Sequence, residues 1–123
     1  MPHILIIDDS PTEIQKLTSI LIEANNNYRV SASETAEEGL EDAKSLKPDL
    51  ILMDVVMPGL NGFQATRKLS KDKVTCNIPV IIVSTKDQAT DRMWGMKQGA
   101  KAYLVKPVDK DKLLEAVESA LSS

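Results

Sequence analysis

Five short apolar segments alternate with longer amphipathic segments along the chain. Four of them, residues 3–7, 49–53, 79–84 and 102–105, are almost continuous in Ile, Leu, Val and other apolar residues. Such runs are typical of strands buried on both faces of a parallel sheet. The remaining segment, residues 28–32, alternates apolar and polar positions and is expected at an edge of that sheet.

The segments between these strands carry signals for helix starts and ends. Ser10 is a good N-cap residue, Pro11 suits the first turn, and Glu13 would complete a capping box. Thr35 and Glu38 predict a second capping box. Three more helices are predicted, at residues 62–71, between Asp87 and Gly99, and after Pro107 with Asp109 as N-cap.

This order of elements makes five consecutive β–α units. Alternation at this spacing implies an α/β fold, a doubly wound parallel sheet with helices on both faces. A chain of 123 residues suits one domain with one core. In such sheets, ligands bind beside the carboxyl ends of the strands.

Charged and hydroxyl side chains gather at those carboxyl ends. Asp8 and Asp9 follow the first strand, Asp54 follows the third, Ser84 ends the fourth and Lys106 follows the fifth. Any one of these acids alone is more often a helix cap or a turn former. Together on one edge they repel, and a single ammonium does not neutralise them. The combination therefore predicts a bound divalent cation.

Mg²⁺ fits this set, because it prefers oxygen ligands and needs only one or two carboxylates. We expect Asp8, Asp9 and Asp54 to form its site, with the backbone carbonyl of Val56 as a further ligand. A carboxylate beside Mg²⁺ can also act as a nucleophile and form an aspartyl phosphate. Asp54 is then the predicted phosphoacceptor, assisted by the Lys106 ammonium and the hydroxyl of Ser84.

Composition narrows the class of protein. The net charge is −3 and no basic run stands out, which argues against nucleic-acid binding and against an electrostatic membrane anchor. No apolar run has the length of a membrane span, so membrane insertion is not expected. A single cysteine cannot form an internal disulfide, and a cytoplasmic protein is the simplest interpretation.

Four motifs resemble the receiver domains of two-component response regulators, of the CheY-like type. They are "ILIIDDS", "DLILMDVVMPGLNGF", "PVIIVST" and "GAKAYLVKP", in this order, and the resemblance extends over essentially all of the chain. It implies one receiver domain over residues 1–123, with a flavodoxin-like strand order 2-1-3-4-5 and no output domain. Signalling by protein–protein contact is therefore expected.

The resemblance also implies a role for each residue at the edge of the sheet. Asp54 takes a phosphoryl group from a histidine kinase or a histidine phosphotransfer domain. Asp8 and Asp9 form the Mg²⁺ pocket, and Ser84 and Lys106 contact the phosphoryl group. Tyr103 is the switch residue that moves inward when Ser84 shifts. The Lys106–Pro107 peptide bond is expected to be cis.

A finer resemblance is to stand-alone receivers of the twitching-motility, PilH type, which belong to chemosensory systems controlling type IV pili. The segments "SPTE", "MPGLNGFQATR" and "TKDQATDRMWGMKQGAKAYLVKPVD" carry it. It implies a monomer with a downstream protein target. The methionines, including Met93 and Met96, are interpreted as core or rim residues. For Trp94, packing is favoured slightly over partner contact.

Alternatives of other classes remain open at this point. The chain could be a pseudo-receiver that never carries phosphate, or a phosphate sink in a phosphorelay. A flavodoxin-like flavin or nucleotide binder is disfavoured, because the acidic "DDSPTE" loop would repel phosphate. A phosphoaspartate hydrolase on a related sheet is disfavoured by the absence of a D-x-D motif. Measured Mg²⁺ affinity discriminates, since a pseudo-receiver should bind the ion poorly.

Overall fold

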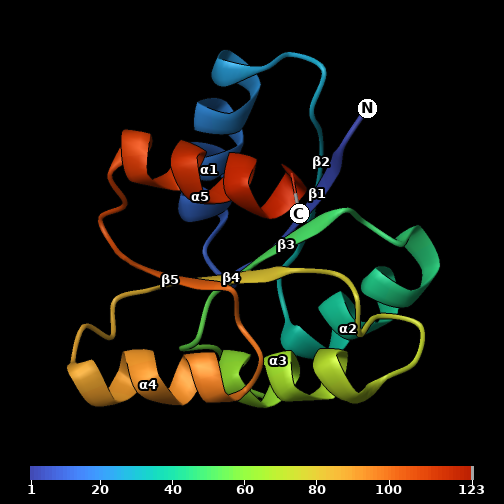
Figure 1. The fold of residues 1–123 in the computed structure, drawn as a ribbon, viewed down its shortest axis with the longest axis vertical. Helices are drawn as coiled ribbons and strands as arrows, with labels where there is room; N and C mark the ends of the chain where they lie inside the picture. Colours follow the sequence, from blue (N-terminus) through green and yellow to red (C-terminus); the bar gives the residue numbers. More distant parts are fainter. Residues whose placement is uncertain (123) are drawn as a thin grey trace.

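The computed structural model describes residues 1–122, in which a parallel sheet lies between two layers of helices (Figure 1). The strands are β1 (His3–Ile7), β2 (Arg29–Ser33), β3 (Leu50–Met53), β4 (Val80–Ser84) and β5 (Ala102–Val105). The helices are α1 (Pro11–Ala24), α2 (Ala36–Leu46), α3 (Gly62–Lys71), α4 (Ala89–Lys97) and α5 (Lys110–Ser122). Every predicted strand is present, with boundaries within about one residue of those expected from the apolar runs.

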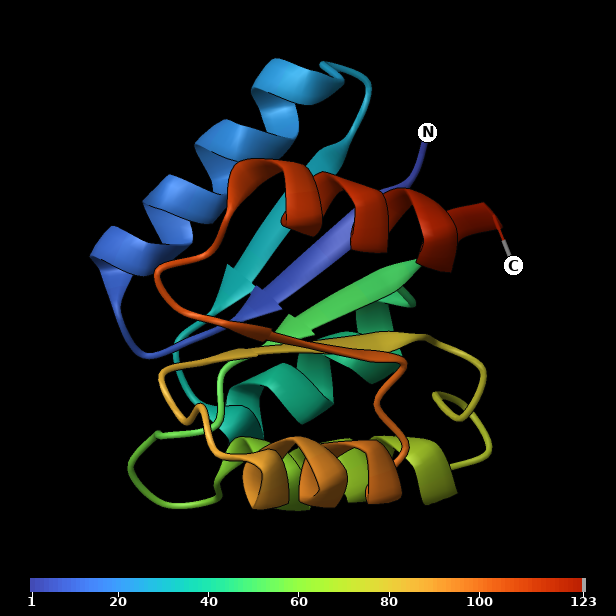
Figure 2. The same cartoon turned by 60° about the vertical axis from the view of Figure 1, so that its left-hand side comes forward.

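The strand order is β2-β1-β3-β4-β5, and all neighbouring pairs are parallel, which confirms the predicted topology. The alternating strand β2 lies at an edge, as expected. Ile7, the last residue of β1, is in register with Ser33 on one side and Met53 on the other. The arrowheads of β1, β2 and β3 therefore end together (Figure 2), and the residues that follow β1 and β3 start side by side.

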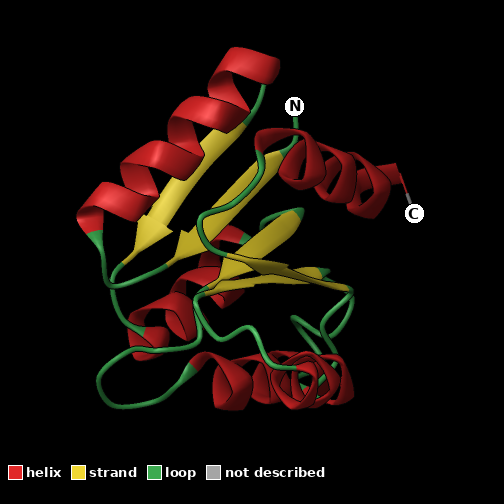
Figure 3. Cartoon of the chain, turned by 90° about the vertical axis from the view of Figure 1, so that its left-hand side faces the viewer, coloured by secondary structure: helices red, strands yellow, loops and turns green. Residues whose placement is uncertain are grey.

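The two faces of the sheet bury separate cores. Helices α1 and α5 cover one face, and α2, α3 and α4 cover the other (Figure 3). Alternate residues of β1 contribute to each: Ile4 and Ile6 join the cluster with α1 and α5, whereas Leu5 and Ile7 join the cluster with α2 and α3. Because both faces are covered, Ile4 to Ile7 are apolar at every position, and the buried His3 at the start of the strand is hydrogen-bonded to Ser31.

The predicted caps of α1 and α2 are confirmed only in part. The Ser10 hydroxyl accepts from the Glu13 N–H at 3.2 Å, and the Thr35 hydroxyl accepts from the Glu38 N–H at 3.0 Å. The return bond of each predicted capping box is not formed in the described structure, so that part of the prediction is wrong. At α1 the reason is visible: the Ser10 N–H donates to the side chain of Asp8 instead, at 2.9 Å.

A complete capping box occurs where we did not predict one, at the start of α3. The Gln64 N–H donates to Asn61 Oδ1 at 2.9 Å, and the Asn61 N–H donates to Gln64 Oε1 at 3.0 Å. This box fixes the direction in which the chain enters α3. It therefore helps to hold the loop between β3 and α3, which carries Asp54.

The packing interpretation of the large residues on α4 is wrong. Met93, Trp94 and Met96 are 60%, 52% and 45% exposed. The buried residue of this helix is Gly95, which packs against the side chains of Ile82 and Tyr103. The contact of α4 with the sheet is therefore made through a glycine, and its larger neighbours point outward.

Among residues 1–122, no helix combines the length and the apolar character that crossing a membrane would need.

Candidate functional site

The acidic residues predicted at the carboxyl edge of the sheet do come together. The Asp8 N–H donates to the Ser33 carbonyl at 3.0 Å, and the Asp54 N–H donates to the Ile7 carbonyl at 2.9 Å. These bonds continue the sheet pairing one residue past β1 and β3. One carboxylate oxygen from each of Asp8, Asp9 and Asp54 lies within 4.8 Å of the other two. Asp8 and Asp54 are 2% and 6% exposed, whereas Asp9 is exposed.

Lys106 is the cation of this cluster. Its Nζ atom lies 2.9 Å from Asp8 Oδ2 and 3.3 Å from Asp54 Oδ1. The Lys106 N–H donates to the Ser84 carbonyl at 2.8 Å, and the Lys106–Pro107 bond is cis, as predicted. Burial by itself would lower the pKa of the ammonium, but the two carboxylates outweigh it and the pKa is raised. Lys106 is therefore a permanent positive charge between two acids.

Asp54 is the acid of this cluster whose pKa is clearly shifted by its surroundings. Burial raises the pKa of Asp54 to about 6, and the nearby charge of Asp8 adds to this effect. The Lys106 ammonium opposes both, without cancelling them. The cluster thus holds more negative charge than its own cation neutralises, which favours a further cation.

The side chains of Ser84 and Tyr103, also predicted at this edge, are linked through the backbone of Lys86. The Ser84 Oγ atom is fully buried and accepts from the Lys86 N–H at 3.1 Å. The Tyr103 hydroxyl donates to the Lys86 carbonyl at 2.8 Å, with Arg92 5.8 Å from the ring centroid. The ring already lies inward in this structure, so the inward position expected of the switch residue is occupied before any movement of Ser84. Burial raises the pKa of Tyr103. A movement of Ser84 would therefore reach Tyr103 through Lys86.

The residues at this edge fit a hard divalent cation. The carboxylates of Asp8, Asp9 and Asp54 are oxygen donors of the kind that Mg²⁺ prefers. In the adjoining loop, the Val55 carbonyl accepts from the Gly62 N–H at 3.0 Å. The Val56 carbonyl accepts no hydrogen bond within the described part of the chain, and the Val56 side chain is exposed. The Val56 carbonyl therefore stays a predicted ligand, with no hydrogen bond from the described residues to compete with a cation.

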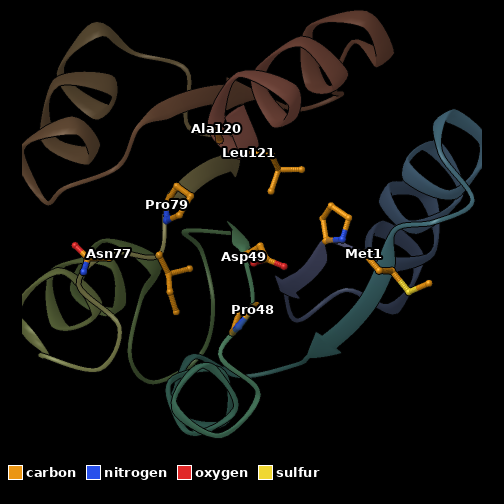
Figure 4. A pocket seen from close by; sticks show the side chains of 9 residues that line it. Met1, Pro48, Asp49, Asn77, Pro79, Ala120 and Leu121 are labelled. Atoms are coloured by element: carbon orange, nitrogen blue, oxygen red, sulfur yellow. The ribbon is translucent and has the colours of Figure 1, made fainter. Parts of the chain in front are cut away.

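Within residues 1–122, the opposite edge of the sheet holds no comparable group of acids. A shallow hollow lies there, at the amino ends of β1, β3 and β4 (Figure 4). The residues labelled around it are Met1, Pro48, Asp49, Asn77, Pro79, Ala120 and Leu121. Its acid, Asp49, already accepts the His3 N–H at 2.7 Å. The candidate site is therefore the carboxyl edge, as predicted.

Comparison with known proteins agrees with this geometry. Residues 4–118 match the family model described as the response regulator receiver domain. The chain is 54% identical over 122 residues to Protein PilH of Pseudomonas aeruginosa, and the match covers 99% of each chain. It is also 38% identical over 121 residues to the DNA-binding dual master transcriptional regulator RpaA of Synechocystis, of which it spans 49%.

Solved structures share the whole fold. The chemotaxis protein CheY4 of Vibrio cholerae superimposes with a TM-score of 0.89 at 27% identity, covering 98% of this chain and 99% of that one. The receiver domain of the Francisella response regulator 1452 gives the same TM-score at 29% identity, covering 99% and 98%. Receiver-type proteins of different bacteria therefore share this arrangement of strands and helices.

Proposed function

The chain belongs to the response regulator receiver family, a family of signalling modules rather than classical enzymes, and we propose that it signals by accepting a phosphoryl group on Asp54. The observation that carries this proposal is the placement of Asp54 beside Lys106 and two further acids at the edge of the sheet. The phosphoryl donor is a histidine kinase or a histidine phosphotransfer domain. Because these donors act in the cytoplasm, we place the protein there.

The chemistry is an in-line displacement at phosphorus. A carboxylate oxygen of Asp54 attacks the phosphorus of a phosphohistidine, the P–O bond forms, the P–N bond breaks, and the imidazole leaves. Mg²⁺, held by Asp8, Asp9, Asp54 and the Val56 carbonyl, would supply neutralising charge. The Lys106 ammonium already donates a hydrogen bond to Asp54 Oδ1. It would pair with the transferred phosphoryl group as negative charge accumulates on the phosphoryl oxygens.

The output is a change of surface. In this proposal the Ser84 hydroxyl moves toward the phosphoryl group. Its present hydrogen bond from the Lys86 N–H is then broken. Tyr103, which donates to the carbonyl of the same residue, follows this change. The altered surface contacts a downstream protein, without nucleic acid and without membrane insertion, and the protein acts as a monomer.

The identity to Protein PilH favours a chemosensory system controlling type IV pilus twitching motility. A phosphate sink within such a phosphorelay would use the same chemistry. The positions two residues after Asp54 and two residues after Ser84 hold Val56 and Lys86, and in this proposal these two residues tune the lifetime of the aspartyl phosphate.

Intact mass after incubation with acetyl phosphate and Mg²⁺ tests the phosphoacceptor. We expect a single labile phosphoryl adduct on the wild type, which is lost without Mg²⁺ and lost in Asp54→Asn. The matched control is Asp111→Asn, an exposed acid on α5, which should be labelled like the wild type. Stable labelling of Asp54→Asn at another residue would contradict the assignment. Failure to take up phosphate and to bind Mg²⁺ would indicate a phosphate-independent pseudo-receiver.

A further inference from the structure

The Glu13 side chain, in the first turn of α1, has a buried oxygen without a donor. Glu13 Oε1 is fully buried and accepts no hydrogen bond from residues 1–122. The Glu13 N–H donates to Ser10 Oγ at 3.2 Å, so Glu13 occupies the third position of the helix. In a capping box, the side chain at that position accepts the N–H of the N-cap residue, here Ser10. That bond is missing.

The same chain contains the completed form of this motif. At α3, the Asn61 N–H donates to the side chain of Gln64 at 3.0 Å. Glu13 has the chemistry and the sequence spacing to do likewise for Ser10. A buried acceptor without a donor is unfavourable. The unpaired oxygen therefore indicates a partner that is engaged elsewhere.

The missing donor is engaged by a residue of the acidic cluster. The Ser10 N–H donates to Asp8 Oδ1 at 2.9 Å. The other oxygen of Asp8, Oδ2, accepts from Lys106 Nζ at 2.9 Å. Both oxygens of Asp8 are thus already in use in the arrangement seen here. A divalent cation in the cluster would compete for this carboxylate with the Ser10 N–H and the Lys106 ammonium.

We propose that Glu13 is a positioning residue that takes over the Ser10 N–H when a divalent cation draws the Asp8 carboxylate toward itself. This inference rests on the proposed Mg²⁺-dependent function. The exchange gives the buried Glu13 oxygen a donor and completes the capping box of α1. Glu13 therefore favours the cation-bound state without being a ligand, and it raises the affinity of the site for Mg²⁺.

The test is an Mg²⁺ titration of the full chain, followed by the backbone amide NMR signals of the wild type and four variants. Glu13→Ala removes the acceptor, and Glu13→Met removes it while keeping a long side chain. Glu13→Gln keeps an acceptor oxygen and removes the charge. Its side chain is then the same as that of Gln64, which accepts the N–H in the complete capping box. Glu38→Ala is the matched control, at the third position of α2, far along the chain from Asp8.

We expect Glu13→Ala and Glu13→Met to bind Mg²⁺ about threefold to tenfold more weakly, the effect of one net hydrogen bond. Glu13→Gln should stay within about twofold of the wild type, since its oxygen still accepts. Glu38→Ala should bind like the wild type. Mg²⁺ should shift the Ser10 amide signal in the wild type and in Glu13→Gln, by more than in the two variants without an acceptor.

Thermal denaturation separates this role from a purely structural one. Without Mg²⁺, Glu13→Met should have nearly the stability of the wild type, because the removal of an unpaired buried acceptor offsets the loss of the favourable interaction between the Glu13 charge and the N-terminus of α1. A marked loss of stability in that state would show that Glu13 supports the helix regardless of the ion, and would overturn the proposal.

Two further results would also overturn it: equal Mg²⁺ affinity of Glu13→Met and the wild type, or an equal loss in Glu13→Gln and Glu13→Met, which would indicate charge alone. If the wild type itself does not bind Mg²⁺, the proposed function fails as well, and the two failures are distinguishable.

Discussion

The Asp54 carboxylate lies where burial and a neighbouring acid both disfavour its negative charge. Its pKa in the folded protein is about 6, against an ordinary value of 3.8. Between these two values the folded protein binds the proton more tightly than the unfolded chain. The contribution of Asp54 to stability therefore falls as the pH rises through this window, and the penalty is fully present above it.

Removing this charge should stabilise the metal-free protein. For Asp54→Asn we expect an increase of about 1–3 kcal/mol in the free energy of unfolding near neutral pH, because each pKa unit is worth about 1.4 kcal/mol. Lys106 stays paired with Asp8 in this variant. Urea denaturation of both proteins measures the difference.

The pH dependence provides the control for this prediction. The advantage of Asp54→Asn over the wild type should shrink as the pH falls below about 6 and vanish below 3.8, where Asp54 is protonated in both states. A variant that is no more stable than the wild type at neutral pH would show that Lys106 neutralises Asp54 more completely than the pKa of Asp54 indicates.

At the scale of elements, the start of α3 packs closely against the backbone of Asp54 and Val55, just after β3. A Cβ atom at Gly62 would overlap the Asp54 carbonyl and approach the Val55 backbone. Backbone atoms cannot turn aside as a side chain can. Glycine is therefore required at this close approach.

Gly62→Ala should consequently destabilise the protein by about 2–3 kcal/mol and lower phosphorylation by displacing Asp54. The matched variant is Gly59→Ala in the same loop, where φ is +77° and the added atom meets the flexible Glu37 side chain. We expect about 1 kcal/mol of destabilisation from its left-handed backbone and unchanged labelling capacity. Equal labelling of the two variants by acetyl phosphate would argue against the fit described for Gly62.

Helix α4 marks the limit of what could be predicted from the sequence. The strands were predictable, because a run buried on both faces must be apolar throughout. Their order placed Asp8, Asp9, Asp54 and Lys106 correctly on one edge. Whether Trp94 packs or points outward depends on which side of α4 meets the sheet. Gly95 makes that contact, and its lack of a side chain gives no hydrophobic signal.

The same limit applies to Lys86 and to Glu13. Lys86 links Ser84 and Tyr103 through its backbone N–H and carbonyl, which any residue type other than proline would supply. Glu13 was predicted to complete a capping box, but the Asp8 carboxylate competes for the same N–H. That competition arises only once the fold brings these groups together.

Exposure of Trp94 leads to a direct prediction. Trp94→Ala should change the free energy of unfolding by less than about 0.5 kcal/mol, as for other surface positions. Ile82→Ala, at a fully buried position on β4, should lower it by about 2–5 kcal/mol. Urea denaturation of the two variants makes the comparison, and a large effect at Trp94 would restore the packing interpretation.

At the scale of the whole molecule, the site draws on segments that are distant along the chain. Lys106 is 98 residues from Asp8 and 52 residues from Asp54. The pairing of β1, β3, β4 and β5 brings them together, so no local fragment contains the site. Denaturation should therefore abolish phosphorylation of Asp54 at the same point at which the native fold is lost.

We therefore expect the initial rate of labelling by acetyl phosphate to fall with urea along the same curve as the circular dichroism signal, as for a small two-state domain. The control is the wild type returned to buffer without urea, which should regain its full rate. Loss of labelling well before the loss of secondary structure would indicate that the edge of the sheet opens separately.

The order of the strands also has a consequence for biosynthesis. The ribosome delivers Asp8, Asp9 and Asp54 before Lys106, whose ammonium bridges Asp8 and Asp54 and which directly follows β5, the last strand of this sheet to emerge. Until then the nascent chain carries the three acids without the Lys106 ammonium, and the sheet lacks its edge strand β5. Only molecules translated past Lys106 carry the complete cluster, so unfinished chains would not compete for the phosphoryl donor.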